Sequence, residues 1–154
     1  MRIYVASSWR SYLQPTVVRV LRKAGHEVYD FRNPDQGPAA EGSQVFHWRE
    51  IDPRWERWTA KDVIEGLQHP RAQAQLASDV EAMRWAEVIL LVLPCGRSAH
   101  LQLGWGVGQG KHTAILLEED GPELMYGMVD KLCVSLAEVL HWLGDLELAR
   151  SAGS

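Results

Sequence analysis

The sequence predicts an α/β fold: a doubly wound parallel sheet of about five strands with helices on both faces. Two observations carry this prediction. Short apolar runs alternate with helical patterns along the chain, and the strongest run, 87–93, is almost entirely apolar, as in a strand buried on both faces. About twenty residues separate it from the next run, 113–117, which leaves room for a helical crossover between two parallel strands.

Local signals mark the predicted elements. Pro15 suits the first turn of a helix. Thr59 followed by Asp62, and Ser135 followed by Glu138, are typical of helix N-terminal caps. The strands are expected at residues 3–6, 27–31, 87–93, 113–117 and 132–134, and the helices are expected to begin near residues 15, 59, 70, 98, 122 and 135.

The segment 101–110 is the most ambiguous one. Its apolar residues alternate with polar residues and glycines, which locally mimics a strand. Glycine is unfavourable inside a strand, and two parallel strands need a crossover between them. We therefore expect a helix there.

Asp79 lies at the edge of an apolar stripe on the helix that begins at Pro70. A buried carboxylate costs free energy unless it is paired or used. Asp79 is therefore either a boundary residue bonded to a nearby backbone N–H or a functional group, and its spacing leaves both open. The stripe is expected to consist of Ala72, Leu76, Val80 and Met83.

Composition excludes several classes of protein. Of the 154 residues, 46% are hydrophobic and 23% are charged, which suits one globular domain, 1–150, with a tail at 151–154. The net charge of -4 and the absence of a Lys/Arg run disfavour binding to a nucleic-acid duplex. No apolar run approaches a membrane span, so we expect no membrane contact, and the lack of a disulfide framework indicates a reducing cytoplasm. Cys95 and Cys133 form neither a disulfide framework nor a metal-binding spacing, so we expect no metal.

A Trp-rich insert at 32–58 interrupts this rhythm. It begins with loop residues and continues into a stretch dense in Trp, Arg, Glu and His. A loop of this length inside a compact domain is usually a lid or a binding element. His47 and Trp48 could stack on a base or sugar, or could pack the insert onto the sheet, and the sequence leaves both open.

The loops after the first and third strands are the expected site. With a flavodoxin-like strand order, loops 7–10 and 94–98 meet where the strand order reverses, which is where such sheets bind ligands. We expect Ser98 to cap the following helix, so that backbone N–H groups, the helix dipole and Arg97 converge on an anion such as a phosphate monoester. The alternative is a capped helix with a solvated Arg97. The candidate binding residues are Ser7, Trp9, Arg10, Asp30, His47, Trp48, Gly96, Arg97 and Ser98.

Cys95 lies in the second of these loops. It is either a nucleophile at a strand end, with His100 one turn into the helix, or a small buried residue, which is the commoner case.

Three features together resemble the nucleoside 2-deoxyribosyltransferase superfamily, which includes the 2'-deoxynucleoside 5'-phosphate N-hydrolases and the CMP N-glycosidases. They are the opening 3–6, the helix with Asp79 followed by a hydrophobic strand, and the turn into 99–104. The resemblance covers roughly residues 2–117 without the Trp-rich insert. It implies a flavodoxin-like fold and an enzyme that cleaves N-glycosidic bonds without a cofactor.

The resemblance also implies residue roles. The family's nucleophilic glutamate falls at Gln102, and a helical aspartate that orients the sugar or handles a proton at the base falls at Asp79. Arg97 and Ser98 fall in the loop that contacts the 5' end of the substrate, where they suit a nucleoside 5'-monophosphate. The family also implies at least a homodimer, because a neighbouring subunit usually completes the site.

Gln102 is the decisive departure from the family, because a carboxamide cannot carry the covalent step. Either the chain is an engineered glutamate-to-glutamine variant that traps substrate, which we favour, or it is a nucleotide-binding sensor or regulatory protein without turnover. The loop Cys95–Gly96–Arg97 lacks the acidic residue of many transferases, which favours hydrolysis over base transfer. A pure interaction domain that uses the Trp-rich insert is the third alternative.

Overall fold

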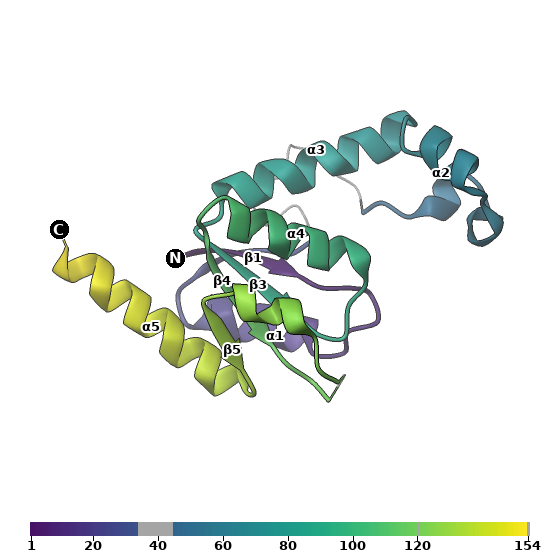
Figure 1. The fold of residues 1–154 in the computed structure, drawn as a ribbon. Coiled ribbons are helices and arrows are strands. Elements are labelled where there is room, and N and C mark those ends of the chain that lie inside the picture. The colour runs from purple at the N-terminus through teal and green to yellow at the C-terminus, as the bar shows by residue number, and fades with distance from the viewer. Residues whose placement is uncertain (34–44, 120, 154) are drawn as a thin grey trace.

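The computed structural model describes residues 1–33, 45–119 and 121–153. Within them lies one five-stranded sheet in the order β2-β1-β3-β4-β5, and every neighbouring pair of strands is parallel (Figure 1). The predicted α/β fold with the flavodoxin-like strand order is therefore confirmed. The strands are β1 (Arg2–Ala6), β2 (Glu27–Tyr29), β3 (Val88–Val92), β4 (His112–Leu116) and β5 (Lys131–Cys133).

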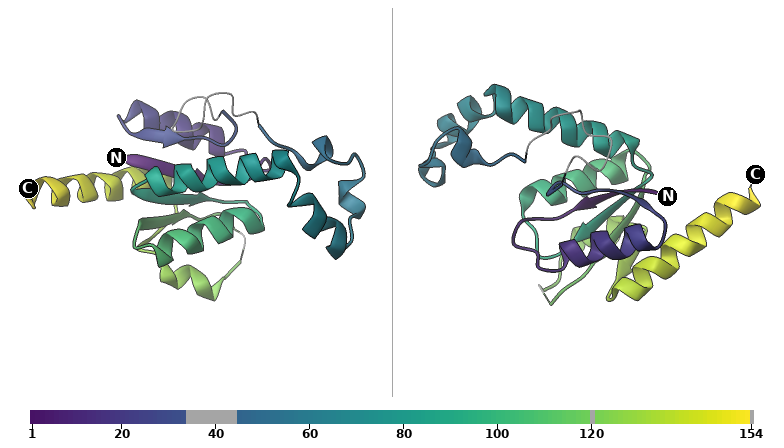
Figure 2. Two further views of the ribbon diagram at one scale, coloured as in Figure 1. Left: turned by 90° about the horizontal axis from the view of Figure 1, so that it is seen from above. Right: turned by 180° about the vertical axis from the view of Figure 1, so that it is seen from behind.

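Helices cover both faces of the sheet (Figure 2). Buried residues of α1 and α5 pack on one face, and buried residues of α3 and α4 pack on the other. The α-helices are α1 (Gln14–Lys23), α2 (Ala60–Gly66), α3 (Pro70–Trp85), α4 (Arg97–Gly108) and α5 (Leu136–Ala152), and the 3-10 turns are η2 (Trp48–Glu50), η3 (Trp55–Arg57) and η4 (Leu124–Met128). No helix of the described residues is both long enough and apolar enough to cross a membrane.

The central strand β3 has apolar side chains on both faces of the sheet, so helices must bury both faces. Val88, Leu90 and Val92 join the core under α1 and α5, while Ile89 and Leu91 join the core under α3 and α4. All five residues of β3 are buried. The helix predicted over 101–110 is confirmed as part of α4.

Gly106 allows α4 to approach β3 closely. A Cβ at this position would lie 2.7 Å from Cδ1 of Ile89, which is closer than real Cβ contacts. One of the glycines that argued against a strand is thus needed where the helix packs on the sheet.

Both predicted caps are present. Thr59 and Asp62 form a reciprocal capping box at α2. Ser135 Oγ accepts a hydrogen bond from the Glu138 N–H at 3.2 Å, although the Glu138 carboxylate accepts from the N–H of Val134 and not from that of Ser135.

Two sequence predictions about α3 and α4, the helices on one face of the sheet, need correction. The cap of α4 is Gly96 and not Ser98, because the helix already begins at Arg97 and Ser98 lies within its first turn. Leu76 is 53% exposed and lies outside the core, because the amino-terminal half of α3 runs past the edge of the sheet (Figure 2). The buried residues of α3 are Ala72, Ser78, Ala82 and Met83.

The carboxyl terminus and the segment before β5 also differ in detail. Helix α5 continues to Ala152, past the start of the tail expected at 151–154, because each added turn bonds to the one before it. The short helix expected near Pro122–Val129 is the 3-10 turn η4.

The described part of the Trp-rich insert, together with α2, forms an arm (residues 45–69) beyond the carboxyl edge of the sheet. Figure 1 shows this arm at the amino-terminal end of α3, on the side of the sheet away from α5. Phe46 and Trp48 pack edge to face, as do Trp48 and Trp58, so the arm has an aromatic cluster of its own. The expected insert residues 34–44 lie outside the described residues.

Candidate functional site

A cleft of about 700 Å³ opens at the carboxyl ends of β1 and β3. The two loops that the sequence placed there are bonded to each other: Ser7 Oγ donates to the Val92 carbonyl at 2.8 Å, and Ser8 Oγ donates to the Pro94 carbonyl at 3.1 Å. The arm supplies the outer wall. The cleft is lined by Tyr4, Ser7, Ser8, Trp9, Arg10, Phe31, Val45, Phe46, Trp48, Trp55, Gln75, Asp79, Gly96, Arg97, Ser98, Ala99 and Gln102.

The inner end of the cleft is electropositive. Helix α4 begins there with Gly96 as its cap, and glycine has no side chain that could accept from the free N–H groups of the first turn. The guanidinium of Arg10 lies 3.8 Å from the position that a Cβ of Gly96 would occupy. Neither Arg10 nor Arg97 pairs with an acidic side chain among the described residues. Two guanidinium groups and a helix N-terminus thus line one end of the cleft, where none of the described acidic side chains pairs with them.

Asp79 lies on α3 with one of its two oxygens already used. Oδ1 accepts from the Tyr29 hydroxyl at 3.0 Å and from Gln75 Nε2 at 2.9 Å. Oδ2 has no protein partner among the described residues, and Asp79 lines the cleft. Burial raises the pKa of the Asp79 carboxyl group, although the two hydrogen bonds oppose this shift. The result is a carboxyl group that holds a proton more readily than an exposed one and presents one oxygen to a ligand.

Gln102 lies on α4, four residues after Ser98 and therefore on the same side of the helix. It is half-buried and lines the same cleft as Asp79. The structure thus brings together both residues to which the resemblance assigns chemistry.

Gln75 and Tyr29 are the residues that the sequence analysis missed. Gln75 precedes Asp79 by four residues on one helix, so the i,i+4 spacing could have shown that the two side chains meet. Tyr29 comes from β2, fifty positions away, and its ring stacks on Tyr4 with centroids 5.1 Å apart. Burial is the main cause that raises the pKa of Tyr29, so its hydroxyl remains a donor to Asp79 at neutral pH.

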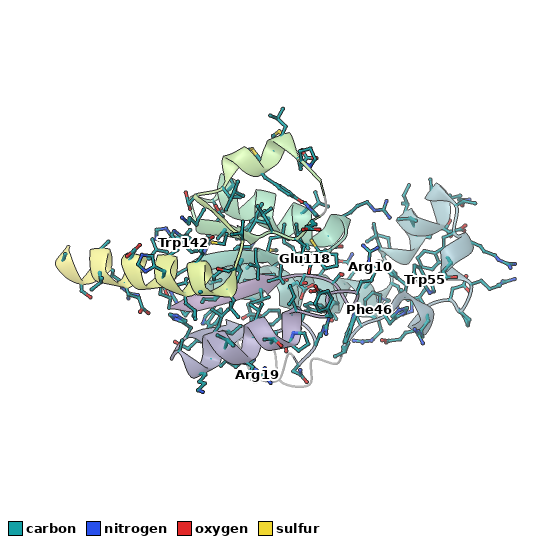
Figure 3. The ribbon with its side chains drawn as sticks, turned by 90° about the horizontal axis from the view of Figure 1, so that it is seen from below. Arg10, Arg19, Phe46, Trp55, Glu118 and Trp142 are labelled. Atoms are coloured by element: carbon teal, nitrogen blue, oxygen red, sulfur yellow. The ribbon has the colours of Figure 1, made fainter. Side chains whose placement is uncertain are left out.

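The arm contributes two of its three tryptophans to the cleft. Trp48 and Trp55 line it together with Phe46, while Trp58 packs on Gly66 and donates from Nε1 to Asp52 at 2.9 Å. Figure 3 shows Arg10 at the strand ends, with Phe46 and Trp55 lying from there out along the arm. The insert therefore both packs on itself and lines the candidate site.

Two predicted binding residues do not line the cleft. His47 caps η2, where its ring accepts from the Arg49 N–H at 3.1 Å. Asp30 is buried and accepts from Gln14, from the Arg32 N–H and from Asn33. Both side chains bond to neighbours in the protein.

Cys95 lies beside His100, with Sγ 3.7 Å from Nδ1. The same Nδ1 lies 2.8 Å from the Gly96 carbonyl, which can only accept a hydrogen bond, so Nδ1 carries a proton. It therefore cannot take the thiol proton, and Nε2 is engaged with the Tyr126 hydroxyl at 2.9 Å. This arrangement argues against Cys95 as a nucleophile, although the residue is only half-buried and not the fully buried cysteine that was the expected alternative.

No protein-family model matches the sequence, and no curated protein sequence matches it either. Among solved structures, the chain is similar to a 2-deoxyribosyltransferase from the psychrotolerant bacterium Bacillus psychrosaccharolyticus. The TM-score is 0.60 at 19% identity, and the match covers 91% of this chain and 90% of that one. The likeness extends over nearly the whole chain, so the protein has a nucleoside deoxyribosyltransferase-like α/β fold.

Proposed function

We propose that the cleft binds a nucleoside 5'-monophosphate and that its architecture is that of an enzyme hydrolysing the N-glycosidic bond. The observation that carries this proposal is the shared cleft. The start of α4 with Arg10 and Arg97, which have no acidic partner in the described part of the chain, lies on the same cavity as Asp79 and Gln102. The outer wall of that cavity is aromatic. The fold of the solved 2-deoxyribosyltransferase supports a nucleoside ligand.

The order of these groups suits a mononucleotide. A phosphate at the start of α4 would meet the backbone N–H groups of the first turn, Arg10 and Arg97. Gln102 lies about 6 Å further along the helix axis than Ser98, since each residue rises 1.5 Å. A sugar attached to that phosphate would reach Gln102 and Asp79, and its base would extend towards the arm.

A carboxylate at position 102 could attack the anomeric carbon of that sugar. The carbon–nitrogen bond would break, its electron pair would go to the base, and Asp79 would supply the proton that the base needs. Water would then hydrolyse the glycosyl ester. The raised pKa of Asp79 supports the proton-donor role.

Gln102 prevents the first of these steps, because a carboxamide is a very poor nucleophile. Glutamine and glutamate are nearly isosteric, so the cleft keeps its shape for substrate. The chain therefore binds the nucleotide and leaves it intact, as a substrate-trapping glutamate-to-glutamine form would. The second candidate function, a nucleotide-binding sensor or regulator without turnover, is favoured by the same residue if glutamine is the native one.

Restoring the carboxylate tests the proposal. The Gln102→Glu variant should release free base from at least one member of a panel of ribo- and deoxyribonucleoside monophosphates, measured by chromatography. The unchanged chain should bind that nucleotide without cleaving it. Gln109→Glu is a matched control, because Gln109 is an exposed residue at the end of the same helix and does not line the cleft.

The possible results separate the two candidates. Binding without base release by Gln102→Glu would favour the sensor. Base release at a normal rate by the unchanged chain would show that Gln102 is not at the nucleophile position. Absence of binding by any monophosphate would contradict both.

The expected homodimer and cytoplasmic location stay predictions. One feature supports a dimer: Gly104 and Gly108 lie on α4, and a Cβ at either position would meet no atom within 4 Å. This surface of α4 would let a second helix approach closely.

A further inference from the structure

Gln75 is a cleft residue whose amide has a fixed orientation. Its Nε2 lies 2.9 Å from Asp79 Oδ1 and donates to it, one helical turn away on α3. The Tyr29 hydroxyl donates to the same oxygen, so any proton that Asp79 takes up sits on Oδ2. Oδ1 therefore remains an acceptor in both protonation states of Asp79, and Gln75 must always turn its NH₂ group towards it.

The carbonyl oxygen of the Gln75 amide, Oε1, is left available to a ligand. Gln75 Oε1 has no hydrogen-bond partner among the described residues, and it is not one of the buried side-chain atoms that lack one. Because Gln75 lines the cleft, this carbonyl is a hydrogen-bond acceptor that solvent or a ligand can reach there.

The position of Gln75 along α3 places this acceptor at the aromatic end of the cleft. The next residue outward on the same side of the helix is Arg71, which donates to Glu50 of the arm at 3.0 Å. The Arg71 guanidinium also lies 5.9 Å from the ring centroid of Phe46. Phe46 lines the cleft with Trp48 and Trp55, and such rings suit a flat heterocyclic base.

We propose that Gln75 makes the cleft selective for nucleotides whose base carries an exocyclic amino group, cytosine and adenine, over their oxo counterparts, uracil and hypoxanthine. This inference rests on the proposed function and names its substrate class. An amino group would donate to Oε1 of Gln75. An oxo group would bring a second acceptor against it and leave both without a donor.

The unchanged chain gives the first test, because it should bind nucleotides without consuming them. Calorimetry with CMP, UMP, AMP and IMP at pH 7 should show CMP binding at least about tenfold more tightly than UMP, and AMP at least about tenfold more tightly than IMP. Each pair differs at the amino group and in the protonation of the adjacent ring nitrogen, while charge and sugar stay the same.

The Gln75→Met variant gives the second test. Methionine keeps the length of the side chain and removes the acceptor, so the preference within each pair should fall to about twofold or less. The preference for a monophosphate over its nucleoside should remain, because it depends on the other end of the cleft. Gln109→Met, a substitution outside the cleft, should change neither preference, and circular dichroism checks that both variants are folded.

The outcomes distinguish this inference from the proposed function. Equal affinity for all four nucleotides, or an undiminished preference in Gln75→Met, would overturn the role of Gln75 and leave nucleotide binding in place. Absence of binding by these four would overturn this inference, and absence of binding by every monophosphate of the wider panel would overturn the proposed function as well.

Discussion

Two regions at the carboxyl edge of the sheet each contain a half-buried or buried aspartate, and they use it differently. In the β2 cluster, which consists of Asp30, Gln14, Arg32 and Asn33, both oxygens of Asp30 accept hydrogen bonds from the protein. In the cleft, Asp79 uses one oxygen and leaves the other open. Both residues were candidates on sequence grounds, so residue type alone does not distinguish them.

The arginines of the two regions differ in the same way. Arg32 donates from Nη2 to the backbone carbonyls of Ser8 and Ser11, both at 2.8 Å, and so fixes the loop after β1. Arg10 lies on that loop and has no acidic partner among the described residues. A polar group whose bonds are filled by the protein stabilises the fold, whereas a group with bonds left open is available to a ligand.

The largest difference should appear in the rate of base release. In a Gln102→Glu background, Asp79→Asn should lower the rate by about 10²-fold or more, because asparagine cannot supply the proton. Asp30→Asn should leave the rate almost unchanged at a temperature where the variant is folded. Chromatographic assay of both double variants checks this, and equal losses would show that the two aspartates do not differ in role.

The next largest difference concerns phosphate. Arg10→Met should weaken binding of a nucleoside monophosphate by roughly 1.5–3 kcal/mol, the value of one charge-assisted hydrogen bond, and should leave nucleoside binding unchanged. Arg19→Met is the control, since Arg19 is exposed on α1, far from Arg10 (Figure 3). Calorimetry measures all four affinities. If Arg10→Met weakens nucleoside and monophosphate equally, Arg10 supports the cleft wall and not the anion site.

The smallest expected difference concerns the free energy of unfolding, which the same substitution should change in opposite directions at Asp30 and Asp79. Asp30→Asn should lower the free energy of unfolding by about 1–3 kcal/mol, because the hydrogen bonds lose a charged acceptor. Asp79→Asn should raise it at pH 7, because burial favours the neutral form and raises the pKa of Asp79 above 3.8 in the folded state.

The pH dependence gives the check on that sign. A raised folded-state pKa means that the stability contributed by Asp79 is present below pH 3.8 and is lost as the pH rises through the folded pKa. The advantage of Asp79→Asn should therefore appear between acid and neutral pH in urea unfolding curves and vanish near pH 3. A destabilised Asp79→Asn protein at pH 7 would contradict the raised pKa of this carboxyl group in the folded state.

Much of the fold follows from local sequence. The apolar runs give all five strands within about two residues. The signal is strongest for β3, which is buried at every residue and therefore apolar throughout. The strand order brings the loops after β1 and β3 together, and Ser7, Arg10, Gly96 and Ser98 all line the cleft between them. Thr59 and Asp62 cap a helix through contacts between residues only three positions apart, which a sequence pattern can show.

Only the tertiary structure decided which polar groups have hydrogen bonds left to offer a ligand. The hydrogen bonds from Tyr29 to Asp79 and from Gln14 to Asp30 join residues fifty and sixteen positions apart, and no periodicity encodes them. The other bonds to Asp30 come from its near neighbours Arg32 and Asn33. The exposure of Leu76 likewise depends on where α3 passes the edge of the sheet. A sequence fixes which side chains can bond, while the arrangement of the elements determines which bonds are filled inside the protein and which are left for a ligand.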